Sequence, residues 1–517
     1  MRMRSVNRFL LGAAATTLVA GAAVAVTAHG DDDFKDFRGS QRAKNVILFI
    51  GDGMGVSTIT ATRVYSVGVA GQLVMDQFPY TALSRTYSAD SITPDSAPTM
   101  TAMMTGQNAN AGVLGLDDTT EFGDFNGDGD GKRLRTLLEQ AKRRDMKVGV
   151  VSTARITHAT PAATYAHINN RDNENAIALQ SLPSDGTYNQ ALEDGIDVLF
   201  GGGRRHFVPN TVFDEESARG SRPDGRDLRS EYQAAGYTYV HNTTGFNSLN
   251  RQSLPVLGLF EASHMEWEFD RTSDAAGEPS LTQMTLKAID LLKGGQRKRG
   301  HWNRDNGYFL MVESGRIDHA HHDGNALRAL HDTQELDEAI GAAIRAVDLR
   351  DTLIIVSADH SHVFNIAGYP IRPLSEMPYP VEPCPGSSYG ALAGNGVLDL
   401  VYDVNPATGC VSTSTDNNGT PYTALVYGNG PGYRGTPRVD PTTDPFVGVA
   451  GSTDFPGPNP TGFAHPNYRQ EAAVPFVSET HSAEEVAIYA IGAGSEMVRG
   501  TVKNTFIYRV MAKALGF

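Results

Sequence analysis

The sequence contains only two cysteines, and its 44 Lys and Arg are outnumbered by 59 Asp and Glu. The formal net charge of −15 argues against a specific nucleic-acid partner, because a phosphate backbone demands a basic surface. A small anionic substrate remains compatible with this charge, since bound cations can reverse the local field. Long apolar runs are also missing beyond the first stretch of the chain, so no later segment is predicted to span a membrane.

The first stretch reads as a secretory signal peptide at 1–28. Three arginines precede an apolar, alanine-rich run at 9–26, and small residues ending at Ala25 or Ala28 offer cleavage sites. An uncleaved membrane anchor is the alternative, but the run is short and weakly apolar. We therefore expect an exported protein, periplasmic or extracellular, which begins with a polar leader at 29–44. Loss of the three arginines moves the net charge from −15 to about −18.

In an exported chain, Cys384 and Cys410 are close enough in sequence to predict one local disulfide, with two free thiols as the poorer alternative. Both lie in a region rich in Pro and Gly at 368–475. We interpret this region as a loop-rich subdomain inserted into a core formed by 45–367 and 476–517. Wholesale disorder is the alternative, but the aromatic residues and the cysteine pair weigh against it.

The core is predicted to be α/β, with a doubly wound, mostly parallel central sheet flanked by helices. Apolar runs at 45–50, 308–312 and 352–356 are short, rich in Val, Ile and Leu, and lack alternation, as expected for strands buried on both faces. Helical periodicity at 280–292 and 326–346 precedes two of these runs. Further predicted elements are a helix at 133–144, strands at 147–152 and 485–491, and a terminal helix at 505–515.

Acids and histidines follow the ends of these strands. Asp52 follows the first run, Asp359 and His360 follow the last, and Asp318 and His322 come shortly after the run between them. Carboxyl ends of parallel strands converge on one crevice, so a metal cluster is predicted there. Asp318 and His322 are spaced i, i+4, which places them on one face of a helix as a good zinc-binding pair.

Ser96 is predicted to lie near the N-terminus of a helix that continues through 100–104. Free N–H groups at such a terminus can bind phosphoryl oxygens, but a hydroxyl needs a base or a metal to become a good nucleophile. For this segment alone, a serine that merely caps the helix is the alternative.

Several motifs in matching order resemble the metal-dependent alkaline phosphatases. The resemblance runs from Lys44 to the C-terminus and is closest over 258–370, where the mammalian enzymes read much like this chain. The motifs are Gly51-Asp52-Gly53-Met54-Gly55, Pro94-Asp95-Ser96-Ala97, Thr157-His158-Ala159-Thr160-Pro161-Ala162-Ala163 and Asp359-His360-Ser361-His362.

The resemblance implies hydrolysis of small phosphate monoesters through a phosphoserine at Ser96, with release of inorganic phosphate. Arg171 would grip the phosphate beside Asp95, and His158 and His319 would act through water. The family pattern implies two zinc ions and one magnesium. The implied ligands are Asp318, His322 and His481 for one zinc; Asp52, Asp359, His360 and Ser96 for the other; and Asp52, Thr160 and Glu313 for magnesium.

Mammalian members also bind calcium, and here Phe260 (by its carbonyl), Glu261 and Glu278 match, with Glu215 or Glu216 as the remaining ligand. Family members are usually dimeric, and the insertion at 368–475 resembles in position the crown region of the mammalian interface. The resemblance therefore implies a homodimer.

Other functions and motifs are less well supported. A phosphodiesterase, a sulfatase or a non-catalytic metal- or phosphate-binding protein remain alternatives. The acidic stretch 124–130 is interpreted as a turn because Lys132 and Arg135 stand where later calcium ligands are expected. The segment 201–205 is interpreted as a strand-to-loop turn, and His321 is expected to point away from Asp318. The histidines interpreted as structural or surface residues are His167, His206, His331 and His362.

Overall fold

The structure is a computed structural model that describes residues 42–123, 131–293, 305–372, 376, 382–385, 396–435 and 465–517. The predicted signal peptide, nearly all of the polar leader and the acidic turn at 124–130 lie outside these residues. Within the described ranges, no helix has both the length and the apolar character that crossing a membrane requires.

The three predicted apolar strands form the centre of the main sheet. They are β1 (Asn45–Gly51), β7 (Tyr308–Ser314) and β8 (Thr352–Ser357), and every residue in them is buried. β1 lies between β7 and β8 and is parallel to both. Burial on both faces explains why these strands lack an alternating pattern.

The main sheet has ten strands, and β16 (Val486–Gly492) is antiparallel to both of its neighbours within it. The other described pairs in this sheet are parallel, so the predicted doubly wound, mostly parallel α/β class is confirmed. In order across the sheet, the strands are β17 (Gly500–Lys503), β2 (Tyr80–Arg85), β16, β8, β1, β7, β3 (Lys147–Arg155), β4 (Val198–Gly202), β6 (Val256–Leu259) and β5 (Thr238–Val240).

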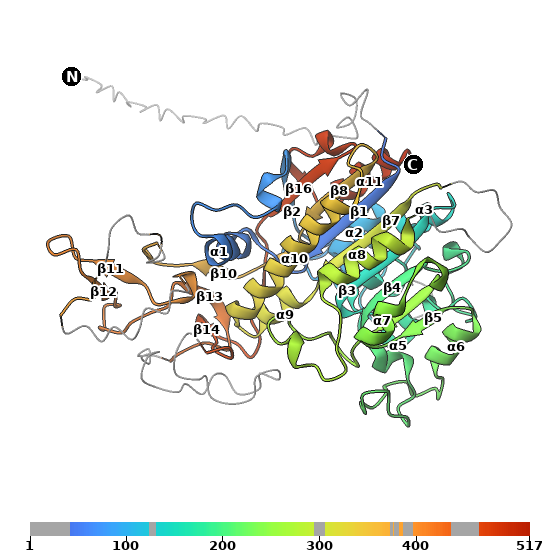
Figure 1. Ribbon diagram of the computed structural model, residues 1–517, viewed down its shortest axis with the longest axis horizontal. Coiled ribbons are helices and arrows are strands. Elements are labelled where there is room, and N and C mark those ends of the chain that lie inside the picture. Colours follow the sequence, from blue (N-terminus) through green and yellow to red (C-terminus); the bar gives the residue numbers. More distant parts are fainter. Residues whose placement is uncertain are drawn as a thin grey trace, which may run out of the picture. The chain divides into compact units, whose positions relative to one another are not determined.

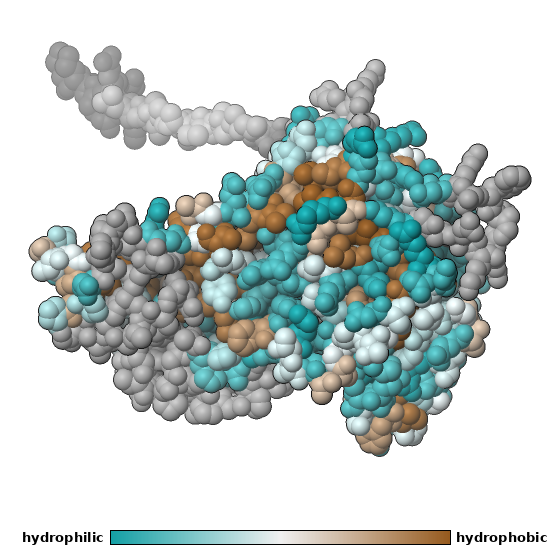
Figure 2. Space-filling view, in the orientation of Figure 1, coloured by the Kyte–Doolittle hydropathy of each residue, from teal (hydrophilic) through white to brown (hydrophobic). Residues whose placement is uncertain are grey.

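Helices cover the sheet in two groups (Figure 1). In the first group, α8 (Leu281–Leu292) and α10 (Ala326–Ala346) pack against each other and against β1, β3 and β7. Hydrophilic side chains lie over the outer surface of α10 (Figure 2). The second group contains α2 (Ser96–Thr105), α3 (Leu137–Lys142) and α11 (Phe506–Leu515). The remaining helices are α1 (Val56–Val67), α4 (Ala159–Ala162), α5 (Glu174–Gln180), α6 (Leu228–Ala234), α7 (Thr243–Ser248) and α9 (Arg316–His322).

Capping side chains set several helix boundaries. Ser280 and Gln283 form a reciprocal capping box at the start of α8, so the predicted helix at 280–292 is confirmed. The predicted helix at 133–144 is too long, because Thr136 and Glu139 form a capping box that starts α3 at Leu137. The predicted range extends before this cap, which periodicity alone did not locate.

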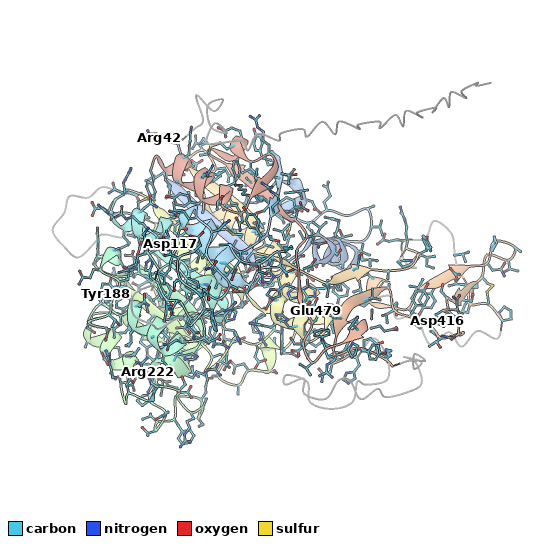
Figure 3. All side chains as sticks on the ribbon, turned by 180° about the vertical axis from the view of Figure 1, so that it is seen from behind. Arg42, Asp117, Tyr188, Arg222, Asp416 and Glu479 are labelled. Atoms are coloured by element: carbon cyan, nitrogen blue, oxygen red, sulfur yellow. A yellow bond between two sulfur atoms is a disulfide. The ribbon has the colours of Figure 1, made fainter. Side chains whose placement is uncertain are left out.

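Two smaller sheets contain strands from the segment 364–475. One contains β10 (Phe364–Ile366), β13 (Leu425–Gly430) and β14 (Glu471–Pro475); a second pairs β11 (Tyr402–Val404) with β12 (Val411–Thr413). Apolar side chains from the first sheet pack against residues of α1 and α10. Cys384 and Cys410 form the predicted disulfide. Glu479 follows β14, whereas Asp416 lies farther from the main sheet, within the segment 368–475 (Figure 3).

Candidate active site

Ser96 is the first residue of α2 and is almost completely buried, with 2% of its surface exposed. The side chain of Asp95 caps this helix by accepting a hydrogen bond of 2.8 Å from the Ala97 N–H. The alternative in which Ser96 caps the helix is therefore wrong. The Ser96 hydroxyl is instead free to face His360, whose Nε2 lies 3.3 Å from Oγ.

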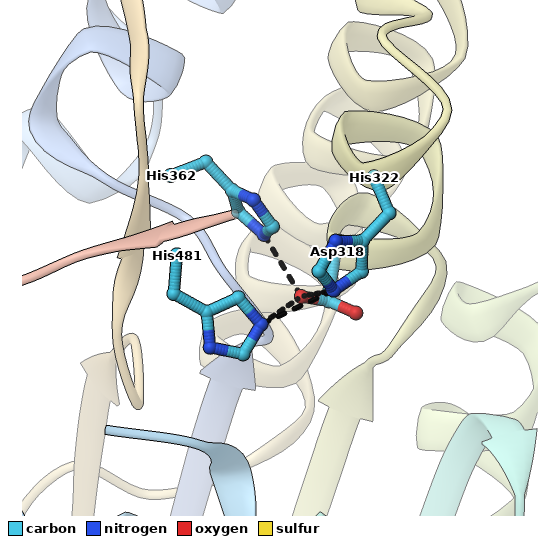
Figure 4. Close-up of side chains that lie close together, drawn as sticks. All are labelled: Asp318, His322, His362 and His481. Carbon is cyan, nitrogen blue, oxygen red and sulfur yellow. Dashed lines mark hydrogen bonds and ion pairs between the residues drawn. The ribbon is translucent and has the colours of Figure 1, made fainter. Parts of the chain in front are cut away.

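Asp318, His322 and His481 meet beyond the carboxyl ends of the central strands (Figure 4). Each histidine donates its Nδ1 hydrogen to a backbone carbonyl, of Glu479 at 2.6 Å and of Pro94 at 2.8 Å. The Nε2 lone pairs of the two rings therefore face each other at 3.1 Å, and each lies 3.4 Å from Asp318 Oδ1. Three electron-rich atoms in this arrangement fit a bound cation.

His362, which the sequence suggested to be a structural or surface residue, joins the same group. Its Nε2 donates to Asp318 Oδ1 at 2.8 Å, and its Nδ1 bonds to the buried carboxylate of Glu479. Burial opposes a charge on this ring, but Glu479 and Asp318 raise the pKa of His362 to about 10. His362 follows His360 by two residues, and in extended backbone residues i and i+2 point to the same side. This spacing could have indicated that His362 lies near the site.

Asp52, Asp359 and His360 form a second group beside Ser96. His360 Nε2 lies 3.5 Å from Asp52 Oδ1 and 3.4 Å from Asp359 Oδ2. Both oxygens of Asp52 are fully buried and have no hydrogen-bond partner among the described residues. Burial raises the pKa of Asp52 well above its usual value, and the charges of Asp359 and Asp318 raise it further. Buried, unpaired carboxylates of this kind also fit a cation.

A third group contains Asp52, Glu313 and His158, with the Thr160 hydroxyl beside Glu313. Glu313 lies inside β7 near its carboxyl end, and one of its oxygens accepts a hydrogen bond from Ser152. Its other oxygen has no partner among the described residues, and burial raises the pKa of Glu313 to about 8. The donor set of Asp52, Glu313 and Thr160 is made only of oxygen, which suits a hard cation such as magnesium.

Arg171 lies beside this cluster and is 18% exposed. Its Nη1 donates to Asp95 Oδ1 at 2.8 Å, and its Nη2 donates to His158 Nε2 at 3.0 Å. Because Asp95 also caps the helix of Ser96, one carboxylate orients both the serine and the guanidinium. His321 is directed as expected, since its ring nitrogens bond to Thr58 and Tyr427.

Glu261 and Glu278 approach each other at the end of β6, and Asp274, which sequence reasoning missed, lies with them. Burial raises the pKa of Glu278 to about 9 and that of Glu261 to about 7, with nearby acids adding to both shifts. Glu216 instead forms an ion pair of 2.6 Å with the buried Arg204.

The other histidines interpreted as structural or surface residues bond to side chains outside the metal groups. His167 bonds to Glu139, His206 bonds to Asn175, and His331 bonds to Tyr65. The segment 201–205 contains the end of β4 and the start of a 3-10 helix at Arg204–Phe207. The chain changes direction between them at Gly203, whose φ of +92° glycine adopts without strain.

Comparison with known proteins identifies relatives along almost the whole chain. A family model for alkaline phosphatase matches residues 43–517. The tissue-nonspecific alkaline phosphatase isozyme of Homo sapiens is 36% identical over 496 residues, covering 91% of this chain and 83% of the human protein. The corresponding isozyme of Gallus gallus is 37% identical, with 91% and 84% covered. The alkaline phosphatase of Gadus morhua is 34% identical, with 92% of each chain covered.

Solved structures share the fold. The alkaline phosphatase of Thermus thermophilus superposes with a TM-score of 0.61 at 24% identity, covering 92% of each chain. The enzyme from the Antarctic bacterium TAB5 gives a TM-score of 0.58 at 22% identity, covering 92% of this chain and 99% of the other. With the family match and the relatives above, these findings show that the chain belongs to the alkaline phosphatase family of metal-dependent phosphomonoester hydrolases.

Proposed function

We propose that this protein is an exported alkaline phosphatase that transfers the phosphoryl group of a monoester to Ser96 and then to water. The observation that carries the proposal is the position of the Ser96 hydroxyl, 3.3 Å from His360 and at the N-terminus of α2. Around it, lone pairs and buried carboxylates converge from strands and helices that are distant in sequence.

The donor sets support two zinc ions and one magnesium. When bound, zinc would act as a Lewis acid on the attacking and leaving oxygens, and magnesium would add positive charge beside them. Imidazole with carboxylate suits zinc, whereas a site of oxygen ligands alone suits magnesium. The residues that would hold them are Asp318, His322 and His481 for one zinc; Asp52, Asp359, His360 and Ser96 for the other; and Asp52, Thr160 and Glu313 for magnesium.

The chain's own residues would bind and orient the phosphoryl group. The planar guanidinium of Arg171 can donate to two phosphoryl oxygens, and Asp95 holds it in place at 2.8 Å. Ser96 is the first residue of α2, and the N-terminus of a helix favours negative charge. His158 would position Arg171, and His319 would reach the phosphate through water.

A phosphodiesterase is the second candidate within the same chemistry. A monoester presents one more charged oxygen to Arg171 than a diester does, so the arginine favours monoesters. We expect aryl phosphate to be cleaved at least about a hundredfold faster than bis-aryl phosphate, with aryl sulfate slower still. Replacement of Arg171 by alanine should lower kcat/KM for aryl phosphate by roughly 10- to 100-fold, since a charge-assisted contact is lost.

Initial rates on the three esters, measured with wild-type protein and the Arg171→Ala variant, test this assignment. An Arg350→Ala variant is a suitable control, because Arg350 is exposed and contacts only its neighbour Asp348 among the described residues. Faster cleavage of the diester would favour the phosphodiesterase. Bound metal without turnover of any ester would favour a non-catalytic binding protein.

Export and calcium binding belong to the same proposal. Removal of residues 1–28 would leave an acidic mature chain, and N-terminal sequencing of protein recovered outside the cytoplasm would locate the cleavage site. Phe260, Glu261 and Glu278, joined by Asp274, would hold calcium. The close approach of these three acids, with burial raising the pKa of Glu278 to about 9, supports this assignment.

A homodimer is also proposed, with the insertion at 368–475 as a crown that contributes to its interface. The alignments with the human and chicken relatives each cover 91% of this chain. Light scattering of the purified protein should give about twice the mass of one chain, which is 55.5 kDa before cleavage. A mass near that of one chain across the accessible concentration range would contradict dimerisation.

A further inference from the structure

The strand β13 lies against both segments that supply ligands to the zinc site proposed for Asp318, His322 and His481. One of these segments is α9, where His321 Nδ1 lies 2.9 Å from the hydroxyl of Tyr427, and both of these residues are buried. The second segment follows β14 and carries His481. Its contact with β13 is made by an asparagine two residues farther along the strand. β13 therefore contacts the zinc site from two directions.

This asparagine, Asn429, bonds to Thr480 through both polar atoms of its amide. Its Oδ1 accepts from the Thr480 backbone N–H at 3.0 Å, and its Nδ2 donates to the Thr480 hydroxyl at 2.9 Å. Thr480 lies between His481 and Glu479, whose carbonyl accepts a hydrogen bond from His322 Nδ1. The amide of Asn429 thus fixes the backbone between two residues that each bear on the direction of a zinc-binding ring.

The segment that carries His481 has little regular structure of its own. Residues 473–478 before it and 483–485 after it are exposed. Between them, β15 (His481–Ser482) is two residues long and pairs only with β9 (Ser361–His362) among the described strands. Exposed segments with few hydrogen bonds open more readily than the core of a protein. The two bonds to Asn429 therefore restrain a segment that would otherwise move easily.

We propose that Asn429 is a positioning residue for the zinc ligand His481. By restraining the backbone of Thr480, it keeps the Nε2 lone pair of His481 directed at the ion and slows release of the ion. Side chains that orient metal ligands typically contribute about 10- to 100-fold to metal affinity. The inference rests on the zinc site of the proposed function. Since β13 belongs to the region at 368–475, it also gives this region a part in holding zinc.

The rate of zinc release from the loaded protein into an excess of a colorimetric chelator tests this role. Asn429→Ala removes both bonds, and we expect one of the two zinc ions to leave about tenfold faster than from wild type. Asn429→Asp should return the release rate to within about threefold of wild type, because its carboxylate accepts from both the N–H and the hydroxyl of Thr480. Thr480→Val removes only the hydroxyl bond, so its release rate should lie between those of wild type and Asn429→Ala.

Asn365→Ala is the matched control, because Asn365 lies in the same sheet and its side chain accepts from the N–H of its neighbour Ile366. Its release rates should equal those of wild type. A wild-type rate in Asn429→Ala overturns the role, even if its melting temperature falls, and the same rate in Thr480→Val does so if Asn429→Ala does not fold. Equal acceleration in Asn429→Ala and Asn429→Asp also overturns it, because the bonds to Thr480 would not be the cause. Wild-type protein that binds no zinc would instead refute the proposed zinc site itself.

Discussion

Replacement of Ser96 by alanine should lower kcat/KM for an aryl phosphate by roughly 10³- to 10⁶-fold, because the variant has no oxygen to attack phosphorus. The fold should remain intact, since the α2 cap is the Asp95 side chain and the Ser96 hydroxyl has His360 as its neighbour. Initial rates and thermal unfolding, measured on the same preparation, separate the two effects. Rapid quenching with labelled substrate should trap phosphate on the wild-type protein and none on the variant.

Ser91→Ala provides the control for this experiment. Ser91 is exposed in the loop before α2 and its hydroxyl donates to the carbonyl of Thr93, so it shares the segment but not the site. Its variant should retain near-wild-type rates. Near-normal activity in Ser96→Ala would refute the covalent route and leave direct attack by water as the remaining chemistry.

Removal of the metals should have the second large effect. After dialysis against a strong chelator, we expect activity to fall by more than about 10³-fold and to return when zinc and magnesium are added together. Metal analysis before dialysis should give two zinc ions and one magnesium per chain, with calcium as a fourth ion. Activity that survives complete chelation would contradict the proposed site.

The metal-free protein should also lose stability as the pH rises, which offers a measurement independent of activity. Burial raises the pKa of Glu313 from an ordinary value of 4.5 to about 8, and burial likewise raises the pKa of Asp52. A carboxyl with a raised folded-state pKa contributes stability below its unfolded pKa, and that contribution is lost as the pH rises through the folded value. Burial of neutral histidines opposes this trend at lower pH, since the pKa of His322 is lowered to about 4 by burial. The melting temperature of the metal-free protein should therefore fall between about pH 6.5, the ordinary pKa of histidine, and about pH 8.

The loaded protein is the control for this pH series, because bound cations compensate the carboxylates across the same range. Its melting temperature should change less between these pH values than that of the metal-free protein. Equal pH dependence of the two forms would show that Glu313 and Asp52 do not face a metal.

Much of the core could be predicted from the chain alone. The runs that form β1, β7 and β8 carry an unmistakable composition, because a strand buried on both faces must be apolar throughout. The place of β16 could not be predicted in this way. Its sequence specifies a strand, but its antiparallel position between β2 and β8 depends on contacts with residues far away in the chain. The start of α3 was predicted too early, because periodicity did not locate the Thr136–Glu139 capping box inside the predicted range.

For the site, sequence motifs were sufficient to nominate Ser96, Arg171 and the residues that now meet around them. They were insufficient for His362, which was interpreted as a structural or surface residue, and for Glu479, because both owe their surroundings to tertiary packing. Glu479, for example, contacts His362 across a separation of 117 residues. An isolated glutamate or histidine in a loop carries no local pattern that distinguishes such a position.

β2 is synthesised early, but its neighbours in the sheet are synthesised near the end of the chain. β2 hydrogen-bonds only to β16 and β17 among the described strands, and β16 is made about 400 residues later. At a synthesis rate of roughly 5–20 residues per second, the backbone groups of β2 lack these partner strands for about 20–80 s. His481, which bonds to the Pro94 carbonyl, likewise arrives near the end. A chain that terminates early therefore lacks β16, which joins β2 to the rest of the sheet, and His481, which completes the predicted zinc site. Truncated products should be inactive and prone to degradation.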